Sequence, residues 1–232
     1  LKVRGHVVFR HYYINDVGRQ SVVIAYGYEK LGRPKPVGKP DSFIGAIYAV
    51  TSCIMEIQRL KKEVERAKES SIREEVSRLQ QELDDWVSVA ADLNTRFPKI
   101  FAQLLDGIGK DEDPEFQVSD LIRGYEAGEE RAKRLVRGVC QLCLQGFKET
   151  FGRAGITLDS WDWESDFIWN SDVTRALNKL RKTPYVFYAG NILEFDAEKA
   201  AQNLNFKETL GLRDDYELSS LTLVRADGTT LY

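Results

Sequence analysis

An apolar run near the start of the chain ends in polar residues that could bind a ligand. These polar residues are Asn15, Asp16 and Gln20, in the sequence HYYINDVGRQ. The β-branched and aromatic residues at 7–14 are typical of a buried strand, and the apolar spacing over 20–31 is typical of a helix. Open α/β sheets bind ligands at such a polar turn, although Asn and Asp also form turns for structural reasons. The pattern leaves open a ligand-binding sheet edge and a purely structural strand–turn–helix unit.

The composition is that of a soluble globular protein. Of the 232 residues, 43% are hydrophobic and 30% are charged, and the net charge is −3. This charge excludes a generally basic nucleic-acid coat, but a local basic face stays open. The chain has no apolar run of about 18 residues and no charged-then-apolar leader. We therefore expect no membrane span and no secretion, and we infer a cytoplasmic location.

Two clusters contain the residue types that bind metals, but not the spacing. They are the C-x-x-C pair Cys140 and Cys143, and the acidic group Asp159, Asp162 and Glu164. The two cysteines lie in an apolar helical stripe, and only Cys53 and two histidines remain as further zinc ligands. No histidine accompanies the acids at the spacing of metal ligands. We expect buried core thiols and no metal site.

A long helical stretch is predicted over residues 53–106, after a proline-rich loop over 32–40 and a cap at Asp41. Its apolar residues recur at steps of three and four, and this register breaks after Ala67. The sequence SIRE at 71–74 is typical of a capping box. We expect two helices folded as a hairpin. Its charged surface favours a solvated face over a partner-binding zipper.

A further helix is predicted over residues 129–152, and it has a basic side. The basic residues are Arg131, Lys133, Arg134, Arg137 and Lys148. They could contact phosphates or pair with the glutamates nearby. Alternating polarity over 156–165 predicts a second strand of the first sheet.

The C-terminal part is predicted as a small antiparallel sheet with helices around it. The expected elements are a helix over 172–182, strands over 184–188, 192–195 and 220–225, and a hairpin turn at Asp227 and Gly228. The chain contains no Gly-rich phosphate loop, no nucleophile elbow and no H-E-x-x-H. The residues alone therefore indicate an α/β fold with a helical insertion and a polar sheet edge, and they name no reaction.

Four motifs, taken in order, resemble those of the arginyl-tRNA synthetases, which are class I aminoacyl-tRNA synthetases, and especially of archaeal-type members. They are YINDVGRQ at 13–20, KPDSFIGAIY at 39–48, GFKETFGRAGI at 146–156 continuing to WDWES at 161–165, and DGTTLY at 227–232. The family carries Y-x-N-D-x-G-x-Q at the first motif and F-D-x-W-x-x-E-S near the third. Each motif is weak alone, and the order of all four makes the resemblance specific.

The resemblance implies an α-rich α/β fold, in which a Rossmann-type nucleotide-binding domain is interrupted by two insertions. Residues 1–31 and 146–170 would belong to the nucleotide-binding sheet, 32–145 to a helical insertion, 171–228 to a small antiparallel α+β insertion, and 229–232 to the return into the catalytic domain.

The resemblance also implies the reaction of an arginine–tRNA ligase. Arginine is activated with ATP and Mg to arginyl-adenylate, and the arginyl group then passes to tRNA(Arg); no cofactor is expected to be tightly bound. Tyr232 would line the arginine pocket, where an aromatic hydroxyl suits a guanidinium. Asn15, Asp16 and Gln20 would lie near arginine or the tRNA 3′ end, with Glu164 and Ser165 behind them.

The chain lacks several of the family's sequences, which include the HIGH-type signature, the Thr-Arg-Asp after the pocket tyrosine, the KMSKS-type loop and the anticodon-binding helices. We therefore expect an internal piece of a longer ligase that has no catalytic residue of its own and is inactive alone. Unpaired strand edges predict self-association of this piece. The alternative is a non-catalytic helical interaction module that uses the hairpin over 53–106.

Overall fold

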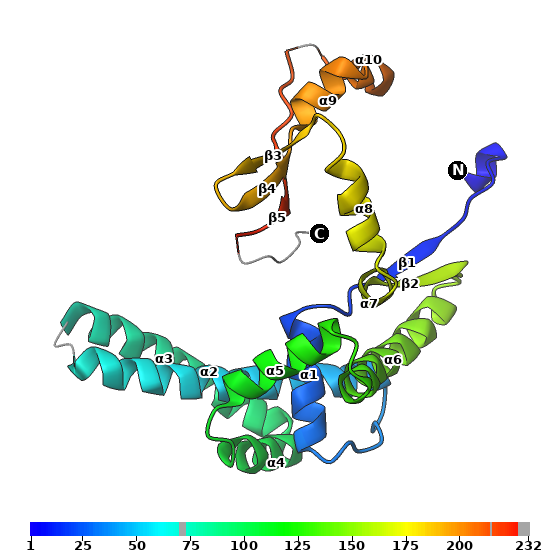
Figure 1. The fold of residues 1–232 in the computed structure, drawn as a ribbon. Coiled ribbons are helices and arrows are strands. Elements are labelled where there is room, and N and C mark those ends of the chain that lie inside the picture. The colour runs from blue at the N-terminus through cyan, green and yellow to red at the C-terminus, as the bar shows by residue number, and fades with distance from the viewer. Residues whose placement is uncertain (70–72, 214, 227–232) are drawn as a thin grey trace. The chain divides into compact units, whose positions relative to one another are not determined.

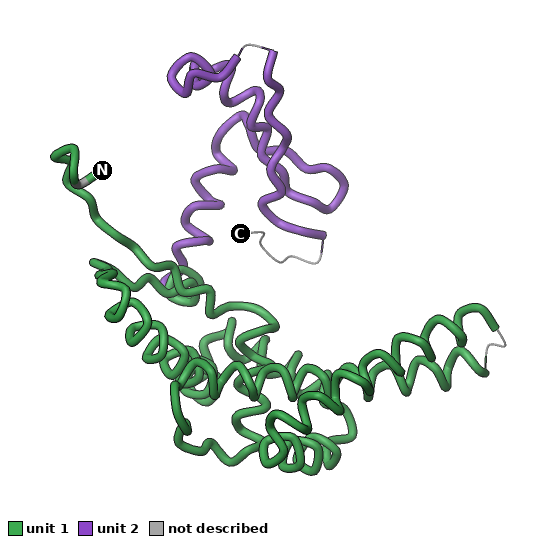
Figure 2. The backbone as a smooth tube through the Cα atoms, turned by 180° about the vertical axis from the view of Figure 1, so that it is seen from behind, with its two compact units in different colours: residues 1–169 green, residues 170–232 purple. Residues whose placement is uncertain are grey.

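The computed structural model describes residues 1–69, 73–213 and 215–226. The chain divides into two compact units (Figure 2). Unit 1 is Leu1–Trp169, and unit 2 begins at Asn170. Both units combine helices with a small sheet, so the predicted α-rich α/β fold class is confirmed at this level.

Unit 1 contains two short strands, and its described residues are otherwise mainly helical (Figure 1). Its elements are a 3-10 helix (Lys2–Arg4), β1 (His11–Ile14), α1 (Arg19–Lys30), α2 (Pro40–Glu69), α3 (Arg73–Arg96), α4 (Pro98–Gly109), α5 (Pro114–Glu126), α6 (Glu130–Arg153), β2 (Ser160–Trp163) and α7 (Glu164–Trp169). The predicted helices after the first turn and over 129–152 are confirmed by α1 and α6.

The first strand is shorter and more exposed than predicted. β1 starts at His11, and Val7 and Phe9 before it are 102% and 64% exposed. The prediction of a buried strand from residue 7 was therefore wrong. The ladder begins at His11 opposite Ser160, next to the carbonyl of Arg10, which accepts the backbone N–H groups of Asp159 and Ser160 at 2.8 and 3.1 Å. In the described residues β1 pairs only with β2, so its other edge has no partner there.

The second strand is parallel to the first. The register runs from His11 opposite Ser160 to Ile14 opposite Trp163. The predicted strand over 156–165 was too long, because Glu164 and Ser165 already form the first turn of α7.

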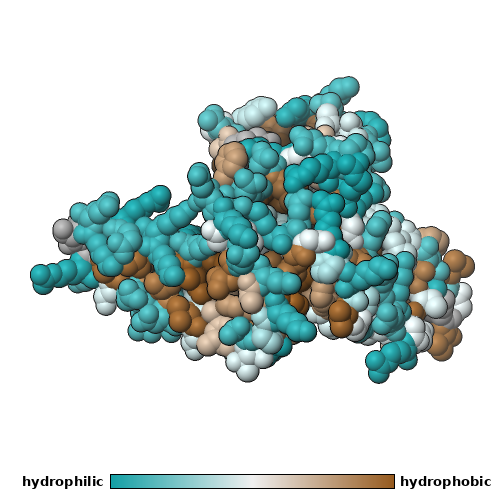
Figure 3. All heavy atoms as spheres, turned by 90° about the horizontal axis from the view of Figure 1, so that it is seen from below, coloured by the Kyte–Doolittle hydropathy of each residue, from teal (hydrophilic) through white to brown (hydrophobic). Residues whose placement is uncertain are grey.

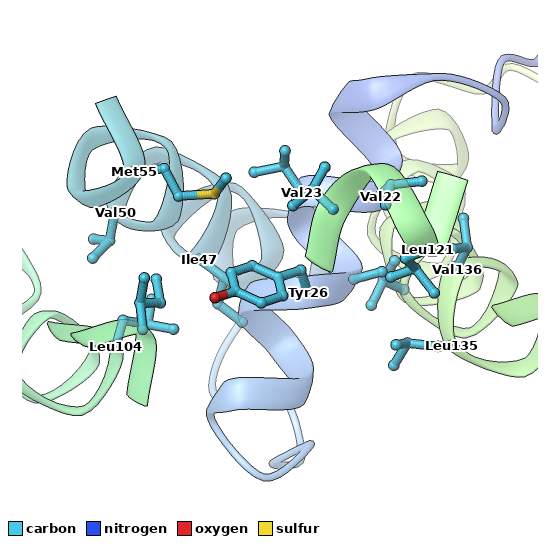
Figure 4. Close-up of a cluster of buried hydrophobic side chains, with 14 of the residues drawn as sticks. Val22, Val23, Tyr26, Ile47, Val50, Met55, Leu104, Leu121, Leu135 and Val136 are labelled. Carbon is cyan, nitrogen blue, oxygen red and sulfur yellow. The ribbon is translucent and has the colours of Figure 1, made fainter. Parts of the chain in front are cut away.

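Helix α1 lies at the centre of the core of unit 1, in contact with α2, α4, α5 and α6. Figure 4 shows the apolar side chains that these helices bring together. They include Val22, Val23 and Tyr26 of α1, Ile47, Val50 and Met55 of α2, Leu104 of α4, Leu121 of α5, and Leu135 and Val136 of α6. A Cβ atom on Gly27 would lie 2.0 Å from Oγ1 of Thr51. This glycine therefore permits the close approach of α1 and α2.

The predicted helical hairpin is confirmed by α2 and α3, which lie side by side (Figure 1). Its apolar stripe is buried inside the hairpin as a second cluster, formed by Leu60, Val64, Ala67, Leu79 and Leu83. Hydrophilic side chains cover much of the hairpin, and apolar side chains are visible along one side of it in Figure 3. Part of the predicted capping box, residues 71–72, lies outside the described residues.

The ends of these helices differ from the prediction. Helix α2 begins at Pro40, so Asp41 lies in its first turn rather than at its cap. Proline suits this first position because its missing N–H would be unpaired there anyway.

By length and composition α2 could cross a membrane, but half of its most apolar stretch is buried inside the structure. The stretch over 53–106 is interrupted at Phe97, because Pro98 disfavours helical geometry for the residue before it.

Unit 2 is a small antiparallel sheet with helices, as predicted. Its elements are α8 (Asp172–Leu180), β3 (Val186–Ala189), β4 (Ile192–Phe195), α9 (Ala197–Asn203), α10 (Phe206–Leu210) and β5 (Leu221–Val224). The strand order is β3-β4-β5. Gly190 has a φ of 62° in the tight connection between β3 and β4, a conformation that glycine adopts without strain. The predicted turn at Asp227 and Gly228 lies outside the described residues.

Candidate functional site

Polar residues follow both parallel strands at their shared carboxyl edge. Asn15 and Asp16 come directly after β1, and Glu164 and Ser165 come directly after β2. With its amide oriented as the neighbouring acceptors require, Asn15 donates through its side-chain nitrogen to Oε2 of Glu164 at 2.8 Å and to the carbonyl of Val17 at 3.1 Å. Because the strands are parallel, the two polar pairs lie at one edge of the sheet, where open α/β sheets bind ligands.

Asp16 is completely buried behind this edge. Its Oδ1 accepts the backbone N–H of Ser165 at 3.0 Å, and its Oδ2 accepts the hydroxyl of Ser165 at 2.6 Å. The hydroxyl of Tyr125 on α5 also donates to Oδ2, and the guanidinium of Arg137 on α6 lies 3.8 Å away. A buried carboxylate is tolerated only with such donors and a cation around it. Burial, and then the neighbouring Asp16, raise the pKa of Tyr125, so the phenol stays protonated as a donor.

Arg137 holds α7 against α6. Its Nη2 donates to the hydroxyl of Ser165 at 2.7 Å and also contacts Asp166. Its guanidinium lies 4.7 Å from the ring centre of Trp163 and 4.5 Å from that of Trp169. The indole N–H of Trp169 donates to the carbonyl of Tyr125 at 2.9 Å. The cation and the two indoles therefore fix the element that carries Glu164 and Ser165.

Glu164 is the second acid at this edge, and its charge is less well stabilised than that of Asp16. Only 8% of this residue is exposed. Burial, and then the charge of Asp16, raise the pKa of Glu164 above its ordinary value, while Tyr13 and the backbone of Val17 stabilise the carboxylate by hydrogen bonds. Together with the exposed amide of Asn15, this carboxylate offers acceptors for a cationic or hydroxyl-bearing ligand.

An exposed aromatic pair lies beside these acceptors. The rings of Tyr13 and Phe167 are nearly parallel, at 18°, with 6.4 Å between their centres. They are 54% and 41% exposed. Exposed aromatic rings of this kind can stack on a nucleobase.

The structure does not place all the predicted site residues together. Asn15 and Asp16 lie at the carboxyl edge, whereas Gln20 lines an open groove of about 290 Å³ together with Tyr48 and Trp86. Tyr232 lies outside the described residues. The roles predicted for Asn15, Asp16, Gln20 and Tyr232 in binding arginine or the tRNA 3′ end stay predictions.

Two acids at the second strand pair with residues at the start of the first strand. Asp159 binds the guanidinium of Arg10 through both oxygens, at 2.8 and 2.9 Å, and Asp162 contacts His11 at 2.7 Å. Hydrogen bonds from Ser160 and then from His11 lower the pKa of Asp162. In the part of the chain that the structure describes, no group of three or more such side chains is placed to hold a metal.

The cysteines pack with the core of unit 1. Cys140 and Cys143, which were predicted to be buried core thiols, are only half-buried against this core, whereas Cys53 is fully buried. Burial raises the pKa of Cys140 to about 12 and the pKa of Cys143 to about 11. Because the thiolate is the reactive form, these thiols are poor nucleophiles at neutral pH.

The basic side of α6 is largely engaged with the protein. Arg131 pairs with Glu29 at 2.8 Å, and Lys133 and Arg134 lie 3.8 and 4.0 Å from Glu130. Lys148 lies over the ring of Trp161 at 4.8 Å. Of the two alternatives for this side, pairing with nearby glutamates is the one that these contacts favour.

Comparison with known proteins identifies relatives along the whole chain. No family model matches it. The chain is 37% identical to the arginine–tRNA ligase of Saccharolobus solfataricus, 35% identical to that of Aeropyrum pernix and 35% identical to that of Sulfolobus acidocaldarius, with 100% of the chain covered each time. It spans 37%, 36% and 37% of the length of these relatives. The resemblance carried by the four motifs is therefore confirmed: over its whole length, this chain is similar to a segment of archaeal arginine–tRNA ligases.

Proposed function

We propose that the chain is part of an arginine–tRNA ligase. The whole enzyme activates arginine with ATP, in the presence of Mg, releases pyrophosphate and forms arginyl-adenylate. It then transfers the arginyl group to the 3′ end of tRNA(Arg). The observation that carries this proposal is the similarity of every part of the chain to proteins named arginine–tRNA ligase. The reaction belongs to the cytoplasm, where we propose that the enzyme acts.

The parallel pair of strands supports a place in the nucleotide-binding domain. Parallel strands that are covered by helices are typical of Rossmann-type sheets, and β1 and β2 pair in parallel although they are far apart in the sequence. We assign residues 1–31 and 146–170 to that domain and 32–145 to a helical insertion. The antiparallel sheet of unit 2 supports a second insertion over 171–228, with the return to the catalytic domain at 229–232.

The polar side chains at the carboxyl edge support the proposal that this edge is part of the substrate site. Arginine carries a guanidinium and an ammonium group, and the tRNA 3′ end carries ribose hydroxyls; each of these groups donates hydrogen bonds. The side chains of Asn15 and Glu164 supply acceptors at the edge, and a carboxylate matches a guanidinium in geometry and charge. We assign Asn15, Asp16 and Gln20 to the binding of arginine or the tRNA 3′ end, and Tyr232 to the wall of the arginine pocket.

Exchange of pyrophosphate into ATP tests the proposal. The natural protein that contains these residues should catalyse arginine-dependent exchange in the presence of tRNA(Arg), and should attach labelled arginine to that tRNA. Lysine, which has a cation but no planar fork, is the matched control and should give background exchange. Exchange that depends on another amino acid, or no exchange at all, would contradict the proposal. The isolated 232-residue piece should be inactive, because the resemblance places the ATP phosphate-binding signature outside it.

A further inference from the structure

The parallel register of β1 and β2 continues beyond the strands through polar side chains. The last backbone pair is Ile14 with Trp163. The next residues, Asn15 and Glu164, are joined by a side-chain hydrogen bond of 2.8 Å. Asp16 and Ser165, one step further, are joined by two hydrogen bonds of 3.0 and 2.6 Å. A polar pair in which only Asn15 is exposed therefore lies directly on a fully buried polar pair.

The buried pair is held by helices from another part of the chain. Tyr125 of α5 donates to the carboxylate of Asp16, and Arg137 of α6 donates to the hydroxyl of Ser165 at 2.7 Å. Both helices lie between the two strands in the sequence. The four side chains therefore join the end of β1, the end of β2 and the intervening helical segment at one point.

We propose that Asp16 and Ser165 are positioning residues of the ligase: they lock the ends of β1 and β2 in register and so hold Asn15 and Glu164 where these bind the substrate. This inference rests on the proposed function. Asp16 is completely buried, and so is Ser165. Their action is therefore indirect, through the backbone of the residue that precedes each of them.

The expected size of the effect follows from the geometry of the edge. When the Ser165 hydroxyl or the Tyr125 hydroxyl is removed, Asp16 loses a donor and the ends of the two strands are less firmly joined. A shift of about 1 Å in groups that position a substrate can slow a reaction by roughly a hundredfold. The loss should affect the substrate that Asn15 and Glu164 bind, and should spare ATP.

Two tyrosines of unit 1 provide a matched pair of variants. Tyr125 donates to buried Asp16 at the edge, and Tyr26 donates at 2.7 Å to Asp111, next to Lys30. Both tyrosines are buried, at 1% and 4% exposure. Tyr125→Phe and Tyr26→Phe therefore each remove a phenol hydroxyl that donates to an aspartate. Only Tyr125 contacts the positioning pair.

The test uses the whole natural ligase and steady-state aminoacylation. Tyr125→Phe and Ser165→Ala should lower kcat/KM for arginine or for tRNA by about tenfold or more, with KM for ATP within about twofold of the unsubstituted enzyme. Tyr26→Phe should lower the melting temperature to a similar extent. It should leave kcat/KM for arginine, kcat/KM for tRNA and KM for ATP within about twofold of the unsubstituted enzyme. Equal kinetic losses in Tyr26→Phe and Tyr125→Phe, no loss in either edge variant, or a loss confined to ATP would overturn the inference. An unsubstituted enzyme that does not charge tRNA with arginine would instead refute the proposed function.

Discussion

Asp16 and Ser165 are joined twice across the carboxyl edge of two parallel strands: the backbone N–H of Ser165 donates to one carboxylate oxygen and its hydroxyl donates to the other. The two residues are 149 positions apart in the sequence. Since Tyr125 and Arg137 complete the set of donors around Asp16, the burial of a single carboxylate depends on contacts from three separate parts of unit 1. The folded edge therefore includes contacts from α5 and α6 as well as from the two strands.

Asp16→Ala should strongly destabilise the protein. The substitution leaves the guanidinium of Arg137 and the hydroxyls of Tyr125 and Ser165 without their shared acceptor. Removal of one partner from a buried ionic cluster costs about 3–5 kcal/mol of unfolding free energy. Denaturant titration of the whole protein measures this cost. The control is Glu115→Ala, which breaks the exposed pair with Arg19 and should cost about 0–1 kcal/mol; equal losses in the two variants would contradict the prediction.

Unit 2 should lose stability in acid because of Glu198. The pKa of this carboxyl group lies at about 2, below its ordinary 4.5, because Lys207 and then the backbone N–H of Leu218 donate to the ionised form. Since the pKa is lower in the folded state, the contribution to stability is complete above pH 4.5 and is lost as the pH falls to about 2.

Glu198→Gln tests this pH dependence. It should lower stability at neutral pH and flatten the fall between pH 4.5 and about 2, as followed by urea unfolding at a series of pH values with a probe in unit 2. The control is Glu208→Gln, which changes an exposed glutamate of α10 in the same unit. A fall in acid that is as steep in Glu198→Gln as in the unsubstituted protein would refute the assignment.

The isolated 232-residue piece should self-associate through β1. Among the residues that the structure describes, one edge of this strand has no partner, and the exposed apolar side chains of Val7 and Phe9 come before it. Unpaired strand edges bind other strands. Light scattering should give a mass that rises with protein concentration. Val7→Lys with Phe9→Lys should reduce this rise, since charge blocks edge pairing, whereas Val37→Lys, at an exposed loop valine, should not. A monomer at every concentration would count against this surface.

The elements that were predicted correctly are those with a local pattern. Helical spacing identified α1, the hairpin and α6, and turn residues separated β3 from β4. No helix was predicted between the stretch over 53–106 and the helix over 129–152, where the structure has α5. Pro114 starts this helix, with Asp113 as the cap that accepts the N–H of Phe116 at 3.1 Å. Proline and aspartate in this order are also the signal of a helix start.

The contacts of the candidate site could not be predicted in the same way. The turn residues Asn15 and Asp16 have a local pattern, but the burial of Asp16 depends on Tyr125, 109 positions away, and on Ser165, 149 positions away. Arg137 was recognised as basic and assigned to phosphates or glutamates, whereas it binds Ser165 and Asp166. The length of β1 likewise depended on where a distant strand begins to pair, which no local pattern contains.

The pair formed by Asn15 and Glu164 gives the sharpest test of substrate binding at this edge. Asn15→Asp places a second carboxylate where an amide nitrogen now donates to Glu164 at 2.8 Å. Two adjacent carboxylates repel each other, and Glu164 already has a raised pKa from burial and from Asp16. Asn15→Asp should therefore raise KM for arginine or for tRNA by about tenfold, which corresponds to about 1.4 kcal/mol.

The double variant Asn15→Asp with Glu164→Gln separates repulsion from a simple loss of the amide. The glutamine nitrogen can donate to the new carboxylate, so the hydrogen bond is restored with its direction reversed. The double variant should recover most of the KM that Asn15→Asp loses, although each single substitution is harmful, and the coupling energy follows from the double-mutant cycle. Additive losses would mean that the two side chains act independently. In that case the hydrogen bond between them would not position the substrate.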